Sequence, residues 1–299
     1  MDEWPALPFD EWRATRDTLH MCTQVVGKLR LALSPFEPQW ANVPLYVTAR
    51  GLTTSPVPYG GRTFDAEFDL LAHELVVRAS DGQTARVPLV QRPVADFAQD
   101  VMTAMHRLGM DVTISPTPSE VADPIPFAED RTHHTYDPGH VTRFFRVLSR
   151  VDVIFKEHRA RFVGKTQPVH FFWGTFDLAL SRYSGRAVTP PADADVITRF
   201  GGDAEQIEAG FWPGQDTFPS AAFYSFAYPK PDGIDHSRVR PDAARWDDDL
   251  GEFVLPYDAF RSESDPRRAL LDFLESTYEA GASKLGWDRE LTHGHQPRP

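Results

Sequence analysis

Apolar residues recur at helical spacing in four stretches of the chain. The clearest stripe, in residues 10–33, consists of Trp12, Thr15, Leu19, Cys22, Val26 and Leu29. This spacing predicts an amphipathic helix, with Asp10 as its N-cap. The same pattern predicts helices over 94–108 and 141–160. A final helix is expected to end at Lys284, because Asp265 is a suitable N-cap and Pro266 suits the first helical position.

Between these helices lie short runs rich in β-branched and aromatic residues, which predict strands. In the first half of the chain the runs cover 44–49, 63–70, 74–79, 84–89 and 112–114, and Asp81-Gly82 signals a hairpin. In the second half they cover 169–173, 177–183, 221–228 and 252–255. The proline-rich stretch 115–139 separates the two sets and is predicted to be an irregular connector.

The two sets of elements end alike. Ala95-Asp96-Phe97 and then Leu108-Gly109-Met110-Asp111 close the first, whereas Leu271-Asp272-Phe273 and then Leu285-Gly286-Trp287-Asp288 close the second. We therefore predict an α+β fold of two similar αβ4α-type halves, with mostly antiparallel sheets and packed helices. The expected boundaries are 1–115 for the first half, 116–140 for the connector, 141–290 for the second half and 291–299 for a disordered tail. A pocket is expected where the halves meet.

Composition narrows the class of partner. A net charge of -12 over 299 residues and a pI near 5.3 argue against a nucleic-acid partner or an anionic membrane surface, since both attract basic proteins. No run reaches the roughly 18 apolar residues of a membrane span, and the acidic N-terminus does not resemble a signal peptide. A cytoplasmic location is expected. A single cysteine, Cys22, excludes an intrachain disulfide and is predicted to be a buried, inert thiol.

Candidate chemistry concentrates in residues 169–186, VHFFWGTFDLALSRYSGR. A hairpin bend at Gly174 would bring His170 close to Asp177, and a carboxylate beside an imidazole is a common acid/base pair. A structural histidine bonded to a backbone carbonyl is the alternative. Trp173 is expected to contact a substrate, and Arg182 or Arg186 to hold an anionic group on it.

Two further stretches are expected to add binding residues. In the run 205–214, EQIEAGFWPG, Trp212 belongs to a predicted rigid turn that could wall an apolar pocket. Tyr224, in the strand that follows, could offer its hydroxyl to a ligand, although buried tyrosines commonly bond the backbone. On the first helix, His20, Gln24 and Lys28 form a polar stripe that faces either solvent or a cavity.

Known cofactor and metal patterns do not appear. His133, His134 and His140 match no standard ligand spacing, so no metal site is predicted. The chain has no G-x-G-x-x-G, no P-loop and no G-x-S-x-G. The cofactor, if any, is therefore unknown.

Several motifs together resemble the uncharacterised bacterial proteins of domain-of-unknown-function family 5996, across nearly the whole chain. They are TLHMCTQVVGKLRLAL, NVPLYVTARGLTTSP, HFFWGTFDLALSRYSGR, GFWPG, FYSFAYPKPDG, GEFVLPYDAF and STYEAGASKLGWDR. The resemblance implies no activity. The family usually has tryptophan where this chain has Cys22, and Ser-His-Glu where this chain has Asp203-Ala204-Glu205. A histidine function at that second position would be lost here.

Three functional hypotheses follow. The first is a small-molecule enzyme with His170 and Asp177 as its acid/base pair in an aromatic-lined pocket. The second is a non-catalytic protein that binds a small molecule between the same aromatic walls. The third is a protein–protein interaction module. The first two predict a cavity, whereas the third predicts a filled core and an exposed apolar patch.

Overall fold

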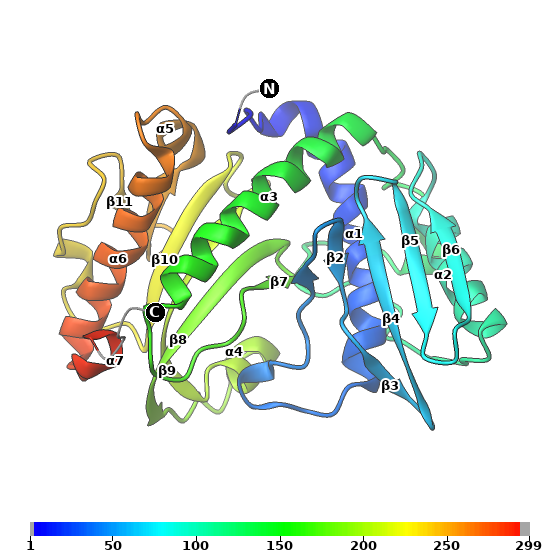
Figure 1. The fold of residues 1–299 in the computed structure, drawn as a ribbon, viewed down its shortest axis with the longest axis horizontal. Coiled ribbons are helices and arrows are strands. Elements are labelled where there is room, and N and C mark those ends of the chain that lie inside the picture. The colour runs from blue at the N-terminus through cyan, green and yellow to red at the C-terminus, as the bar shows by residue number, and fades with distance from the viewer. Residues whose placement is uncertain (1–2, 294–299) are drawn as a thin grey trace, which may run out of the picture.

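The computed structural model describes residues 3–293 and contains two antiparallel sheets of six strands each, with helices packed on them (Figure 1). This architecture confirms the predicted α+β class. The first half begins with α1 (Phe9–Leu33) and ends with α2 (Val94–Arg107). Its strands are β1 (Tyr46–Val47), β2 (Gly51–Thr53), β3 (Val57–Tyr59), β4 (Arg62–Asp69), β5 (Glu74–Ala79) and β6 (Thr84–Pro88). The strand order is β1-β2-β4-β5-β6, and β3 also pairs with β4.

The second half repeats the order helix, sheet, helix. It begins with α3 (Pro138–Arg159) and closes with α5 (Tyr257–Arg261), α6 (Pro266–Leu285) and α7 (Glu290–His293). Its strands are β7 (His170–Phe172), β8 (Asp177–Ala187), β9 (Ala204–Trp212), β10 (Ala222–Tyr228), β11 (Arg245–Asp247) and β12 (Glu252–Pro256). They are ordered β7-β8-β9-β10-β12-β11. A short helix, α4 (Val196–Gly201), lies between β8 and β9, and 3-10 turns occupy η1 (Pro38–Trp40), η2 (Phe127–Glu129) and η3 (Ile234–His236).

The two sheets meet at one antiparallel bridge. The amide of Leu45, just before β1, donates to the carbonyl of Phe171 in β7 at 2.9 Å, and the amide of Phe171 donates back to Leu45 at 2.7 Å. Both side chains are fully buried. The first strand of each half is therefore the one that joins the halves.

Helices cover the sheets and enclose a shared aromatic core. In Figure 1, α3 crosses in front of the second sheet, whereas α1 lies behind the first. The two helices meet where Trp12 of α1 packs on Phe144 of α3, with ring centroids 5.2 Å apart. Phe144 in turn stacks on Phe176, in the β7–β8 turn, at 5.5 Å. Because these contacts link residues from both halves, the core is continuous.

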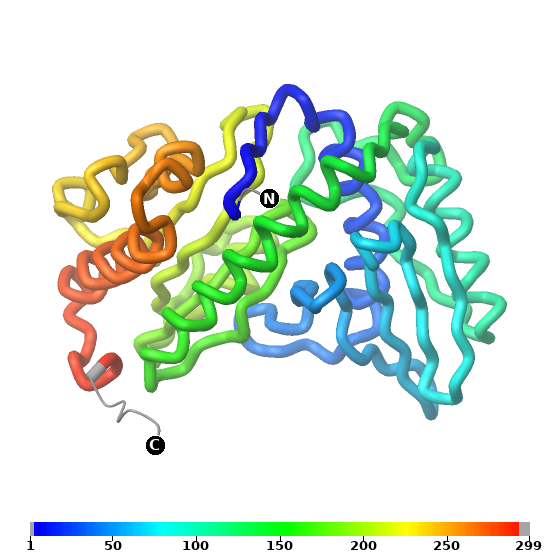
Figure 2. The backbone as a smooth tube through the Cα atoms, turned by 45° about the horizontal axis from the view of Figure 1, so that its top comes forward, coloured from blue at the N-terminus to red at the C-terminus, as the bar shows by residue number. Residues whose placement is uncertain are grey.

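The segment before α1 packs on the second half. Trp4 contacts Phe260 of α5 edge-to-face at 4.8 Å, and the Tyr257 hydroxyl donates to the carbonyl of Pro5 at 2.9 Å. Figure 2 shows this first segment running alongside α5 before the chain turns into α1. Trp4 is only 7% exposed. The first residues of the chain thus help to cover the end of the second sheet.

The predicted helices are confirmed with small shifts, whereas one predicted strand is wrong and four strands, β2, β3, β9 and β11, were not predicted. Residues 112–114 form no strand, and the nine-residue strand β9 was not predicted and takes in the first two residues of the predicted turn 211–214. The chain turns only after Trp212, at Pro213-Gly214, where Gly214 has φ of +100°. The short strand β11 was also not predicted.

Two further points concern the ends of elements. α1 starts at Phe9 after Pro8, so Asp10 lies inside the helix and is not its cap. The predicted tail 291–299 overlaps α7, and its residues 294–299 lie outside the described part of the chain. Among residues 3–293, no helix combines the length and apolarity that crossing a bilayer requires.

Candidate functional site

A cavity of about 460 Å³ lies on one face of the second sheet. Its size is typical of pockets for small molecules. Strands β7, β8, β9, β10 and β12 contribute its floor, whereas α4, the end of α1 and the connector contribute the remaining walls. The lining residues are Leu31, Trp40, Val43, Ser119, Glu120, Phe172, Trp173, Gly174, Thr175, Asp177, Val196, Ile197, Glu208, Trp212, Tyr224, Phe226 and Glu252.

Adjacent strands place three carboxyl groups and one phenol on this floor. Asp177 opens β8, Glu208 lies in β9, Tyr224 in β10, and Glu252 opens β12. Side chains alternate between the two faces of a strand. Glu208, Gly210 and Trp212 therefore share the cavity face, and Phe211 points into the core, where it is fully buried.

Hydrogen bonds fix the carboxyl of Asp177, which is only 2% exposed. The hydroxyls of Thr175 and Tyr224 each donate to one of its oxygens. The Tyr224 oxygen also lies 3.4 Å from Oε1 of Glu208, whose Oε2 accepts from Ser181 at 2.5 Å. Since a phenol has one proton, it can serve only one of the two carboxylates at a time. Tyr224 therefore stands between them as a shared donor.

Burial makes these carboxyl groups weak acids. It raises the pKa of Asp177 to about 6, although the bonds from Thr175 and Tyr224 oppose the rise. Burial and the charge of Asp177 raise the pKa of Glu208 to about 7. Burial, together with the charges of Glu208 and Asp177, raises the pKa of Glu252 to about 8. Groups that titrate this close to neutrality can both donate and accept a proton at physiological pH.

Aromatic rings form the apolar walls. Trp212 stacks on Tyr224 with ring centroids 4.4 Å apart, and the Tyr224 ring lies so close to Gly210 that a Cβ there would come within 2.2 Å of it. Trp173 is anchored by its indole N–H, which donates to the carbonyl of Val43 at 2.9 Å. The sequence predictions for Trp173, Trp212, Tyr224 and Asp177 are consistent with this placement.

The polar stripe of α1 is buried and supports the cavity from behind. His20 Nε2 donates to the carbonyl of Gly174 at 2.9 Å. The Gln24 amide donates to the Ser119 carbonyl at 2.7 Å and accepts from the Ser119 amide at 3.0 Å. Lys28 Nζ donates to the Ser119 hydroxyl at 2.8 Å. Solvent exposure of this stripe is wrong, because all three residues are buried. None of them lines the cavity, and they position the loop beside it instead.

That loop presents a fourth carboxyl group, Glu120. Its backbone has φ of +58°, an uncommon value for a residue with a side chain. Its Oε2 packs against the backbone of Gly174, where a Cβ would come within 1.8 Å. Burial and the charges of Asp177 and Asp195 raise the pKa of Glu120 to about 7, and Lys28 opposes this rise.

His170 lies on the same sheet face as Asp177 but does not contact it. The register pairs His170 with Ala179 and Phe172 with Asp177, and Phe172 packs against the His170 ring at 4.6 Å. His170 Nδ1 donates to the carbonyl of Pro168 at 2.8 Å. Burial lowers the pKa of His170 to about 4, so the ring is neutral at pH 7. The geometry matches the structural alternative that the sequence left open.

The two arginines expected to hold an anion lie elsewhere. Arg182 points to the opposite face of β8, donates to the His158 carbonyl, and lies over the ring of Tyr278 at 4.5 Å. Arg186 follows an irregularity in the β8–β9 register and donates to the carbonyls of Leu285 and Gly286 at the end of α6. Neither residue lines the cavity. Strand alternation explains the difference, because Asp177 and Arg182 are an odd number of residues apart.

Glu120, Glu208 and Glu252 were not recognised from the sequence. Glu208 lies just before the predicted turn 211–214, where no strand was predicted, and alternation along β9 would have placed it on the same face as Trp212. Glu252 stands at the start of a correctly predicted strand, and only the neighbouring strand order shows its place. Glu120 belongs to the irregular connector, whose path no local pattern indicates.

Neither metal chemistry nor thiol chemistry is indicated by the described residues. Within 3–293, no group of three or more His, Cys, Asp or Glu side chains has a geometry that could hold a metal ion. Cys22 is buried in α1, and burial raises the pKa of its thiol to about 12. The thiol is therefore protonated at physiological pH.

The fold and the cavity define a mixed α and β protein with an acidic, aromatic-walled site on its second sheet. A comparison with protein families identifies the chain further: it belongs to a family of unknown function, DUF5996, whose model matches residues 4–293. No curated protein matches the chain, and no solved structure does.

Proposed function

We propose that this protein is a small-molecule enzyme whose acid/base groups are the carboxyls around Tyr224. The observation that carries the proposal is Asp177, a nearly fully buried carboxyl group in the wall of an aromatic cavity. A buried carboxyl costs stability wherever it ionises. Perturbed acids in clefts are characteristic of functional sites.

Asp177 and Glu208 would divide the acid and base roles. Asp177, with a pKa of about 6, is largely ionised at pH 7 and can accept a proton from a bound substrate. Glu208, with a pKa of about 7, is partly protonated and can donate one. The Tyr224 hydroxyl, between the two, can shift its hydrogen bond from one carboxylate to the other as charge moves. In this proposal Asp177 acts as the base itself, and no longer orients His170 as the sequence suggested, and Glu208 replaces His170 as its partner.

Non-catalytic binding of a small molecule is the second candidate, and the same aromatic walls favour it. The two candidates differ in what Asp177→Asn does. This change keeps the size of the side chain and removes its ionisation. An enzyme loses turnover and retains its ligand, whereas a binding protein shows no turnover in either form.

The experiment starts from protein purified without denaturation. Native mass spectrometry would show a retained small molecule, and its release on unfolding would identify it by exact mass. The molecule is then incubated with wild type, Asp177→Asn and His170→Ala, and followed by chromatography for conversion. Conversion by wild type and His170→Ala but not by Asp177→Asn supports the proposal. Loss of conversion in His170→Ala with unchanged melting temperature would contradict it.

A further inference from the structure

We propose that the ligand of this cavity is an organic cation, with an ammonium or guanidinium group bound by the carboxylates and an apolar body held by the aromatic walls. This inference rests on the proposed function of the cavity and adds the chemical class of its substrate. It also replaces the anionic substrate that Arg182 and Arg186 suggested from the sequence.

The first argument is the charge of the lining. Four carboxyl groups line the cavity, from Glu120, Asp177, Glu208 and Glu252, and no Lys, Arg or His among residues 3–293 does. The amine of Lys28 is bonded to the Ser119 hydroxyl and lies 5.5 Å from the centre of the Trp173 ring. Buried charges in proteins are normally paired. Apart from the influence of Lys28 on Glu120, no cation among the described residues pairs with these carboxyl groups.

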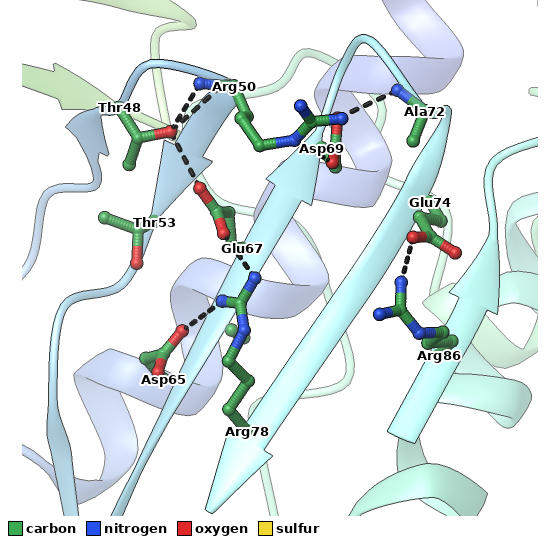
Figure 3. A network of polar contacts seen from close by, with 12 residues as sticks. Thr48, Arg50, Thr53, Asp65, Glu67, Asp69, Ala72, Glu74, Arg78 and Arg86 are labelled. Atoms are coloured by element: carbon green, nitrogen blue, oxygen red, sulfur yellow. Dashed lines mark hydrogen bonds and ion pairs between the residues drawn. The ribbon is translucent and has the colours of Figure 1, made fainter. Parts of the chain in front are cut away.

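On the first sheet, in contrast, the carboxylates are paired with arginines (Figure 3). On its exposed face Arg78 bridges Asp65 at 2.9 Å and Glu67 at 2.7 Å. Arg50 pairs with Asp69 in the same way, and Arg86 with Glu74. Every carboxylate of this network has an arginine from a neighbouring strand or turn. On the cavity face of the second sheet, Asp177, Glu208 and Glu252 have no arginine partner among the described residues, and Arg245, on the same face of β11, lies 4.0 Å from Asp247 instead.

A buried carboxyl oxygen without a hydrogen-bond donor also favours a cationic ligand. Oε2 of Glu252 is buried and has no hydrogen-bond partner within residues 3–293. A hydrogen bond left unmade by a buried polar oxygen costs about 1–3 kcal/mol. An ammonium has three N–H donors and a guanidinium five, so either could bond Glu252 together with Asp177 or Glu208.

The aromatic walls select an organic cation over a metal ion. Trp212, Tyr224 and Phe226 stand in one stack, with centroids 4.4 Å apart for the first two and 6.3 Å for the second two. Ring faces attract weakly hydrated cations by about 0.5–2 kcal/mol. A divalent metal would instead require several oxygen ligands in a tight shell, and the carboxyl groups do not provide one.

A matched series of small probes tests the charge. Benzylammonium, benzyl alcohol and benzoate share the same ring and differ in charge, and binding is followed by tryptophan fluorescence and calorimetry. We expect benzylammonium to bind at least about tenfold more tightly than benzyl alcohol, a factor that corresponds to about 1.4 kcal/mol, and benzoate to bind least. Equal or tighter binding of the alcohol would contradict the proposal of a cationic ligand but would still support the cavity as a small-molecule site. Absence of binding by all three would contradict both.

A variant that introduces a positive charge into the cavity provides a second test. Phe226 lies directly across from Glu208 in the β9–β10 register, as Arg78 lies across from Asp65 in the first sheet. Phe226→Arg should therefore pair with Glu208 and reduce benzylammonium affinity by about tenfold or more. Phe226→Met, which removes the ring without adding charge, is the matched control and should reduce it less. Equal losses in the two variants, with unchanged melting temperatures, would overturn the proposal.

Discussion

The Tyr224 hydroxyl has one proton to donate to either Asp177 or Glu208. Removal of this hydroxyl should therefore affect both carboxyl groups. Tyr224→Phe keeps the stacked ring and removes the donor. We expect the pKa of Asp177 to rise above about 6, because a hydrogen bond to the ionised form is lost. The free energy of unfolding at pH 8 should fall by about 1–3 kcal/mol. Carboxyl NMR titration and chemical denaturation measure the two effects.

Tyr59→Phe is the control for this change. The Tyr59 hydroxyl bonds the backbone of Asp111 far from the cavity. Its loss should leave the titration of Asp177 unchanged. An unaltered Asp177 titration in Tyr224→Phe would show that the phenol does not act as a donor to this carboxylate.

Affinity for a cation should depend on pH. A cation binds the ionised carboxylates, so binding releases protons, and affinity rises as pH increases through their pKa values of about 6, 7 and 8. Glu120, with a pKa of about 7, contributes in the same direction, whereas hydrogen bonds from Thr198 hold the pKa of Asp195 below its usual value, so that this carboxyl is ionised throughout the range. Lys28 beside Glu120 and Asp247 across from Glu252 are the other charged groups near the site. Tyr224 stays protonated, because burial raises its pKa well above the usual value.

The measurement is calorimetry with benzyltrimethylammonium, whose charge does not titrate, between pH 5 and pH 9. Benzyl alcohol is the uncharged control. We expect the cation's affinity to increase with pH and to level off only towards pH 9, because the pKa of Glu252 is about 8. A flat profile for the cation would show that the carboxylates do not bind it.

For single residues, the sequence predicts which side chains belong to the site better than it predicts which of them contact one another. Asp177, Trp173, Trp212 and Tyr224 stand out because polar or aromatic residues interrupt apolar strands. The predicted contact of His170 with Asp177 is not formed, because the register places His170 opposite Ala179 and Phe172 opposite Asp177, and the His170 ring packs on Phe172. The partners of Asp177 come from neighbouring strands, whose order no local pattern specifies.

Helix α1 is the element of the first half that positions the cavity wall. It passes close to Trp173, so that a Cβ on Gly27 would lie 2.3 Å from the indole ring. Gly27→Ala should push the helix and the ring apart and cost about 1–3 kcal/mol. It should also weaken probe binding, because Trp173 lines the cavity. Thermal unfolding and tryptophan fluorescence would follow both effects.

Gly61→Ala is the matched substitution, since a Cβ at Gly61 meets nothing within 4 Å. It should change neither melting nor binding by a measurable amount. If Gly27→Ala behaved like Gly61→Ala, the close approach of α1 to Trp173 would not exist in solution.

The elements differ in how well the sequence predicted them. The long helices follow from their periodicity, and α6 begins at the expected cap, where Asp265 accepts from the Arg268 amide at 3.0 Å. β9 escaped recognition because Glu208 and Gly210 weaken its strand propensity. Both are explained by tertiary contacts, Glu208 by the cavity and Gly210 by the ring of Tyr224 above it.

For the whole molecule, the segment before α1 should stabilise the second half. Trp4→Ala removes a buried ring from its contact with Phe260 and should cost about 3–5 kcal/mol. Phe36→Ala, at a ring 59% exposed, should change stability little. Denaturant unfolding compares the two. A Trp4→Ala effect no larger than that of Phe36→Ala would mean that the segment is not docked.

The connection between the sheets could not be predicted from the sequence. It rests on one backbone pair, Leu45 with Phe171, and backbone groups carry no sequence signal. The sequence did predict that the halves correspond, from their similar endings. We propose that they arose by internal duplication, and superposition of residues 10–114 on 141–290 tests it: agreement limited to one helix and one strand would reject it.

The Leu45–Phe171 bridge bears on how such a protein could have begun. It joins the first strand of one half to the first strand of the other in antiparallel orientation, which is the arrangement two identical subunits adopt around a two-fold axis. If the halves share an ancestor, that ancestor could have been a homodimer, with each copy shielding the open edge of the other. Fusion into one chain would then have freed the two copies to diverge, one keeping its paired charges and the other turning the same face into an acidic cavity.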